Sequence, residues 1–188
     1  MFDLVYRFDP SARHSGDDHP CDCAEALSRL ENGNREFSRM LDAALAANDA
    51  AAPTQRILMV DADALGFPTA DGKAPTQKPF AAVLSCSDAR VPVEMVLGQA
   101  ANRLFVVRVA GNVLGAECLG SLQYALSAMK ESVKAVVVLG HSGCGAVTAA
   151  ADAFLEPSQY LAIAASYPLR AVVDRVLPAV RAAHWGLE

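Results

Sequence analysis

The sequence predicts an α/β protein in which a parallel β-sheet forms the core and helices flank it. Three short apolar runs rich in valine lie at residues 80–85, 104–109 and 135–139. Longer segments with helical spacing of their apolar residues separate these runs. Apolar strands without polar alternation that are joined by helices are typical of a parallel sheet covered on both faces.

The composition indicates a soluble globular protein. The chain has 188 residues, of which 53% are hydrophobic and 20% charged, so it can bury a core. Its net charge of -5 argues against a nucleic-acid surface or an anionic-membrane surface. No apolar run approaches the roughly 18 residues of a membrane span, and residues 1–20 lack the apolar stretch of a secretory signal. We therefore expect a cytoplasmic protein that binds a small molecule or another protein.

The five cysteines do not indicate a disulfide framework, because their number is odd and the chain is large enough to fold without cross-links. In a reducing compartment, metal binding or catalysis is the better interpretation of such cysteines.

The first third of the chain is weakly patterned. Residues 1–20 are polar and without periodicity, which predicts a flexible N-terminal arm before a single α/β domain at residues 21–188. Apolar spacing in residues 21–48 predicts two helical pieces with a break around Gly33. The Ala-, Pro-, Asp- and Gly-rich segment that follows is predicted to be a connection, with a short strand at residues 57–60.

The remaining elements are predicted to be helices. One helix is expected at residues 91–97 and another at residues 116–130, where the apolar residues lie on one face. Residues 145–188 have a helical pattern throughout. Three prolines are expected to start or kink these C-terminal helices: Pro157, Pro168 and Pro178.

Two of the predicted strands end in side chains that can bind a metal ion. Cys86 and Asp88 follow the first strand, and His141 and Cys144 follow the third. Ligands of open α/β sheets bind beyond the carboxyl ends of the strands, so these residues can meet there. Two sulfurs, one nitrogen and one oxygen suit tetrahedral Zn²⁺, whereas Mg²⁺ and Ca²⁺ prefer oxygen alone. The sequence therefore predicts a zinc site.

Residues beside these ligands support the same interpretation. A helix that begins after Cys144 would favour the thiolate form of its sulfur. Arg90, two residues after Asp88, is expected to grip the Asp88 carboxylate with two hydrogen bonds and to compete with the metal for it. Three glycines would let the chain turn between the third strand and the following helix: Gly140, Gly143 and Gly145.

The order of these motifs resembles that of the β-class carbonic anhydrases over about residues 27–150. The shared features are the Cys-x-Asp-x-Arg run that begins at Cys86, the Val-Pro pair after it, the strand at residues 105–108, the pair Gly111 and Asn112, and the His-x-x-Cys-Gly run that begins at His141. The resemblance implies an α/β fold of the same kind. It also implies a zinc lyase, carbonate dehydratase, that reversibly hydrates CO₂ to bicarbonate and a proton by zinc-bound hydroxide.

The resemblance also implies roles for single residues. Cys86, His141 and Cys144 would be permanent zinc ligands. Asp88 would close the site when it binds zinc and open it when Arg90 holds it. Three further roles follow in the same way: Gln77 would bind substrate through its amide, and Phe105, Tyr124 and Gly145 would line the substrate pocket.

Two further implications concern the whole protein. The family usually continues to another strand near the C-terminus, and this sequence reaches Glu188 before such a strand. We therefore expect either a truncated sheet or a rearranged tail. The resemblance also implies a homodimer or a dimer of dimers, in which helical N-terminal segments embrace the neighbour.

Three other functions stay open on the sequence. The same ligands could hydrolyse carbonyl sulfide or carbon disulfide. Without a metal, Cys144 could act as a nucleophile that His141 activates. The chain could also be a zinc-binding subunit that contributes only an association surface.

Overall fold

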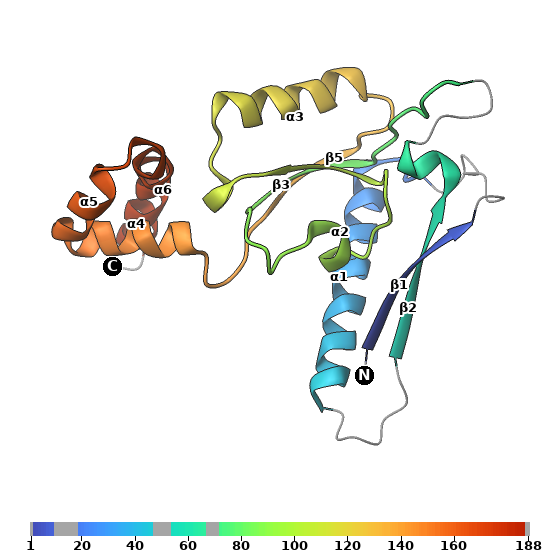
Figure 1. Cartoon of the computed structure of the whole chain (residues 1–188), viewed down its shortest axis with the longest axis horizontal. Coiled ribbons are helices and arrows are strands. Elements are labelled where there is room, and N and C mark those ends of the chain that lie inside the picture. Colours follow the sequence, from blue (N-terminus) through green and yellow to red (C-terminus); the bar gives the residue numbers. More distant parts are fainter. Residues whose placement is uncertain (1, 10–18, 47–53, 67–71, 187–188) are drawn as a thin grey trace. The chain divides into compact units, whose positions relative to one another are not determined.

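The structure is a computed structural model that describes residues 2–9, 19–46, 54–66 and 72–186 (Figure 1). The chain divides into two compact units. Unit 1 comprises Met1–Val83, Pro92–Val106 and Tyr124–Val137, and unit 2 comprises Leu84–Val91, Val107–Gln123 and Val138–Glu188.

The described residues contain strands and helices in alternation. The strands are β1 (Phe2–Asp9), β2 (Thr54–Asp61), β3 (Ala81–Ser85), β4 (Leu104–Arg108) and β5 (Ala135–Leu139). The helices are α1 (Cys23–Ala46), α2 (Val93–Val96), α3 (Ala116–Ala128), α4 (Gly145–Leu155), α5 (Pro157–Ala164) and α6 (Tyr167–Trp185), with short 3₁₀ turns η2 (Ala62–Leu65) and η3 (Ala110–Asn112).

The three predicted apolar strands form one sheet in the order β4-β3-β5. Phe80 N donates to the Arg103 carbonyl (2.9 Å) and Val109 N donates to the Ser85 carbonyl (3.0 Å). Because these bonds join the starts and then the ends of β3 and β4, the two strands run in the same direction. All five residues of β3 are buried. The prediction of an α/β fold with a parallel core is confirmed.

The outer strand β5 is less covered than predicted. Its residues alternate in burial, and Val136 and Val138 are 48% and 67% exposed. The expectation of a sheet covered on both faces therefore describes the central strand but not this outer strand. Within the described parts of the chain, β5 has no strand beside it other than β3.

Helix α1 is continuous, whereas the sequence predicted two pieces broken at Gly33. Gly33 is buried, and a Cβ atom there would lie 1.9 Å from the Leu97 carbonyl oxygen. The side-chain amide of Asn34 donates to the Val96 carbonyl (3.2 Å) at the same contact. The glycine thus permits α1 to approach the backbone around α2 closely, and it does not interrupt the helix.

Residues 2–9 form β1, which differs from the predicted flexible arm. This strand pairs in parallel with β2, from Phe2 opposite Thr54 to Asp9 opposite Asp61, and both lie beside α1 (Figure 1). The strand predicted at residues 57–60 is confirmed as part of β2. The pairing joins segments far apart in the sequence, which a local pattern cannot reveal. Residues 10–18 of the predicted arm lie outside the described residues.

The helices of unit 2 follow the prediction for the C-terminal part of the chain. Pro157 lies in the first turn of α5, Pro168 lies in the first turn of α6, and Pro178 lies inside α6. α4 and α6 pack around a small apolar core: Val113, Ala150, Ala153, Val173 and Val176. Across the described ranges, no helix combines the length and apolar character that a membrane crossing requires.

We predict that Gly33→Ala destabilises the protein by about 1–3 kcal/mol, because the added methyl group overpacks the contact with the Leu97 carbonyl. The midpoint of urea unfolding measures this change. Gly120→Ala is the matched control, since Gly120 is an exposed residue of α3 with no atom within 4 Å of an added Cβ. It should leave the free energy of unfolding unchanged or raise it by up to about 1 kcal/mol. Equal effects of the two substitutions would contradict this interpretation of Gly33.

Candidate metal centre

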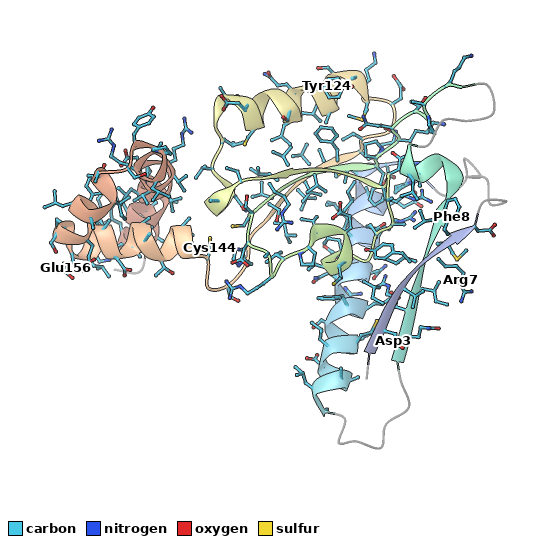
Figure 2. All side chains as sticks on the ribbon, in the orientation of Figure 1. Asp3, Arg7, Phe8, Tyr124, Cys144 and Glu156 are labelled. Carbon is cyan, nitrogen blue, oxygen red and sulfur yellow. The ribbon has the colours of Figure 1, made fainter. Side chains whose placement is uncertain are left out.

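Three of the four predicted ligands lie together in unit 2. One ligand atom each from Cys86, His141 and Cys144 lies within 4.8 Å of the other two. The two sulfur atoms are 3.9 Å apart, and both cysteines are buried. Cys86 directly follows β3, and Cys144 is the residue before α4, where Figure 2 shows it. These three side chains form a group that could hold a metal ion.

Two glycines shape the backbone around this group. Gly143 has a φ of 65°, a conformation that residues with a Cβ atom rarely adopt. Gly111 also has a φ of 65°, and a Cβ there would lie 2.8 Å from the Cβ of Ala146. The Gly111 amide donates to the Cys86 sulfur (3.4 Å). The motif glycine at position 111 therefore contacts a ligand atom directly.

The environment of Cys86 favours its thiolate. Burial raises the pKa of the Cys86 thiol, but the His141 ring and the backbone amides of Gly111 and Asp88 outweigh burial and bring this pKa down to about 7. The interaction with Cys86 raises the pKa of His141, which burial opposes. A thiolate is the form of cysteine that binds a metal ion.

The His141 ring presents one nitrogen toward the group. Nδ1 lies 2.9 Å from the Ser142 carbonyl oxygen. A carbonyl can only accept, so Nδ1 donates this bond, and in the neutral ring Nε2 carries a lone pair. Among the described residues Nε2 is buried and has no hydrogen-bond partner. A buried nitrogen without a partner is costly, and a metal ion would satisfy it. The donor set therefore fits zinc.

The fourth predicted ligand, Asp88, is bound to Arg90. Arg90 Nε donates to Asp88 Oδ1 (2.9 Å) and Nη2 donates to Oδ2 (2.6 Å). This guanidinium holds the pKa of the Asp88 carboxyl well below its usual range. Asp88 Oδ2 lies 3.9 Å from His141 Nε2, outside hydrogen-bond distance. The structure thus contains the grip of Arg90 on Asp88 that the sequence suggested, with Asp88 outside the three-residue group.

Arg90 also ties the two ligand loops together. Its Nη2 donates to the Gly143 carbonyl (3.1 Å), next to Cys144. The same guanidinium therefore holds Asp88 in the loop after β3 and the backbone of the loop after β5. Such a bond to a charged donor is stronger than one between neutral groups.

Sequence reasoning missed the positioning roles of two residues. Arg108, at the end of β4, donates to the Cys86 carbonyl (3.0 Å) and to the Asp88 carbonyl (2.6 Å). Asn112 donates from its side-chain amide to the Leu139 carbonyl (3.0 Å), at the end of β5. The available signal for Arg108 was a charged residue that ends an otherwise apolar strand. Asn112 was noted only as part of a motif.

Four further residues were predicted to bind or surround the substrate. Gln77, Phe105 and Tyr124 belong to unit 1. The Phe105 and Tyr124 rings contact each other with centroids 6.2 Å apart. Gln77 borders a pocket of unit 1 with a volume of about 430 Å³. Gly145 is the first residue of α4, and nothing lies within 4 Å of a Cβ built there. The roles of these four residues stay predictions.

The fold and the ligand group define an α/β protein with a candidate Cys-His-Cys metal centre. Comparison with known sequences shows the family to which it belongs. The sequence model of the family described as carbonic anhydrase matches residues 81–183. Carbonic anhydrase 2 of Mycobacterium tuberculosis is 41% identical over 112 residues, which cover 58% of this chain and 49% of the relative. Carbonic anhydrase of Mycolicibacterium smegmatis is 40% identical over 107 residues, covering 55% and 47%. The chain belongs to the carbonic anhydrase family.

Solved structures that resemble this chain include two β-carbonic anhydrases. The β-carbonic anhydrase CcaA is 28% identical, with a TM-score of 0.43 over 53% of this chain and 46% of that chain. The Coccomyxa β-carbonic anhydrase in complex with acetazolamide is 22% identical, with a TM-score of 0.40 over 80% and 66%. The chain spans about half the length of the curated relatives it matches.

We predict that Arg108→Gln destabilises the protein by about 1–2 kcal/mol, because the Cys86 and Asp88 carbonyls each lose a hydrogen bond from a charged donor. Chemical unfolding of the metal-free protein measures this loss. Arg181→Gln removes the same charge from an exposed position of α6 and should change stability by less than about 0.5 kcal/mol. An Arg108 variant as stable as the Arg181 control would show that Arg108 does not hold the loop.

Proposed function

We propose that this chain is a zinc-dependent carbonic anhydrase that converts CO₂ to bicarbonate and a proton. The observation that carries the proposal is the Cys86-His141-Cys144 group, with both cysteines buried, beside an Asp88 carboxylate that Arg90 holds aside. Three protein ligands leave the fourth tetrahedral position for solvent, which is typical of catalytic zinc sites. Membership of the carbonic anhydrase family supports the choice of substrate.

Each of the three ligands would bind the metal through one atom. Cys86 and Cys144 would bind as thiolates, and His141 would bind through Nε2 while the Ser142 carbonyl fixes the ring. Zinc, when bound, supplies a Lewis acid that lowers the pKa of a coordinated water to about 7. The Gly111 amide would hold the charge on the Cys86 sulfur.

Asp88 and Arg90 would control access to the fourth position. While Arg90 holds both carboxylate oxygens, Asp88 leaves the position open to solvent. We propose that ionised Asp88 then accepts a hydrogen bond from that solvent and orients it toward the carbon of CO₂. Release of Asp88 from Arg90 would let the carboxylate close the site.

Four residues would form the substrate pocket. Gln77 would bind the substrate through its amide, and Phe105, Tyr124 and Gly145 would line the pocket, with the two rings acting as a contacting pair. We further propose a cytoplasmic homo-oligomer. The five cysteines are all free, which suits a reducing compartment.

The zinc ligands are tested by single substitution. Cys86→Ser, Cys144→Ser and His141→Asn should each retain less than about a tenth of the zinc of the unaltered protein after dialysis, because three ligands are the minimum for a tight site. Metal analysis by mass spectrometry measures the zinc content. Cys118→Ser, outside the group, should bind a full equivalent. A zinc content equal to that of the unaltered protein in the three variants would contradict the proposed ligand set.

Asp88→Asn tests the control of the fourth position. This variant should bind zinc normally but lose about a hundredfold in kcat/KM for CO₂ hydration, because an amide can neither carry the charge nor accept both bonds from Arg90. Stopped-flow hydration assays measure the rate, and Asp152→Asn on the exposed face of α4 is the control.

Two other outcomes of these assays would overturn the proposed function. Zinc-loaded unaltered protein that turns over carbonyl sulfide or carbon disulfide but not CO₂ would be a hydrolase. Fully loaded protein without any of these activities would be a non-catalytic zinc-binding subunit.

A further inference from the structure

The two-stranded sheet of unit 1 leaves an edge of β1 without a strand beside it. β1 pairs with β2 along its whole length, and in the described part of the chain neither strand has another strand as a neighbour. An open edge presents unpaired N–H and C=O groups and is a template for pairing with another chain. A two-stranded sheet is also only marginally stable by itself in water. The free edge of β1 could therefore accept a further strand.

Three consecutive side chains of β1 are exposed, whereas Asp3, Leu4 and Val5 are half-buried. Tyr6 and Phe8 are 48% and 49% exposed, and Arg7 is also exposed. Figure 2 shows Asp3 near one end of β1 and Arg7 and Phe8 near the other. Among the described residues, no hydrogen bond or ion pair engages the side chain of Asp3 or Arg7. Two opposite charges on one strand thus have no partner among the residues that the structure describes.

The residues of β1 on the two sides of Val5 complement one another in character. Leu4 and Tyr6 flank it, followed by Asp3 on one side and Arg7 on the other. In an antiparallel pair of β1 strands with a twofold axis at Val5, each Asp3 lies opposite Arg7 of the second copy, and each Leu4 lies opposite Tyr6. Opposite charges and aromatic–aliphatic pairs across antiparallel strands stabilise the sheet.

Other alignments lose this complementarity. A twofold axis at Tyr6 would put Asp3 opposite Asp9, and a parallel in-register pair would put Asp3 opposite Asp3 and Arg7 opposite Arg7. Like charges in these positions are destabilising. A shift of one residue would place Arg7 opposite Leu4 and exchange the faces of the strand. Only the alignment centred on Val5 matches both charge and apolar character along the strand.

The existing pairing with β2 fits the same alignment. Tyr6 lies opposite Leu58 and Phe8 lies opposite Val60, and these two β2 residues are buried. Tyr6 of β1 therefore shares a face of the sheet with the apolar residues of β2. In the antiparallel pair, Leu4 and Tyr6 of a second copy would extend that face across the twofold axis.

We propose that β1 is a self-association edge through which two copies of this chain form a twofold dimer with a continuous β2-β1-β1-β2 sheet. Both copies use the same strand, so the interface is self-complementary and closes at two subunits. The residues involved belong to unit 1 and lie outside the region that matches the carbonic anhydrase family. The proposed dimer therefore does not depend on the proposed zinc chemistry, and each can be tested without the other.

Charge reversal at the two positions tests the proposal on the full-length chain. Asp3→Arg and Arg7→Asp each put like charges opposite one another twice per dimer and should raise the dimer dissociation constant at least about tenfold. The double variant restores opposite charges and should return to within about threefold of the unaltered protein. Arg181→Asp, an exposed charge reversal on α6, is the control and should change nothing. Sedimentation velocity over a concentration series measures the constants. Unchanged association in the single variants, or additive loss in the double variant, would overturn the proposal.

A disulfide cross-link tests the alignment without relying on charge. Directly opposed residues of an antiparallel pair have Cα atoms about 4.5–5.5 Å apart, within reach of a disulfide. Oxidised Val5→Cys should form a covalent dimer that peptide mapping assigns to position 5 and that a reducing agent dissolves. Leu4→Cys faces Tyr6 of the second copy, so it should give no more dimer than the unaltered protein with its five cysteines. No dimer specific to Val5→Cys, or equal cross-linking from position 4, would contradict the twofold axis at Val5.

Discussion

The double hydrogen bond between Arg90 and Asp88 is the interaction on which the metal centre depends. It withdraws a carboxylate from the three-residue group, and through the Gly143 carbonyl the same guanidinium ties the loop after β3 to the loop after β5. Arg108 fixes the backbone of the first loop from β4. The group itself keeps a buried nitrogen on His141 without a hydrogen-bond partner among the described residues. Metal binding would satisfy that atom, so occupancy of the centre and stability of unit 2 should be coupled.

The sequence was most informative where local pattern and chemistry coincide. Uniformly apolar runs predicted β3, β4 and β5, and the rule that ligands bind at the carboxyl ends of strands predicted that Cys86, His141 and Cys144 lie together. The grip of Arg90 on Asp88 followed from their two-residue spacing and their charges. These features depend on neighbours in sequence or on a general property of α/β sheets.

The parts that could not be predicted depend on contacts between distant segments. Gly33 suggested a break in α1, but it serves the close approach to Leu97. β1 looked like a polar arm because its strand partner lies about fifty residues later. Arg108 gave a weak signal, since its targets are backbone carbonyls, which no sequence pattern marks. The chemistry and the proposed association surface thus occupy different parts of the chain: the family match covers the metal centre, whereas β1 lies before it.

The most direct test of the central claim is zinc K-edge X-ray absorption of the zinc-loaded protein near neutral pH. The Cys86-His141-Cys144 group, with Asp88 held by Arg90, predicts two sulfur ligands at about 2.3 Å and two nitrogen or oxygen ligands at about 2.0–2.1 Å, one of them exchangeable solvent. A spectrum without sulfur scattering, or with four sulfur ligands, would contradict the account.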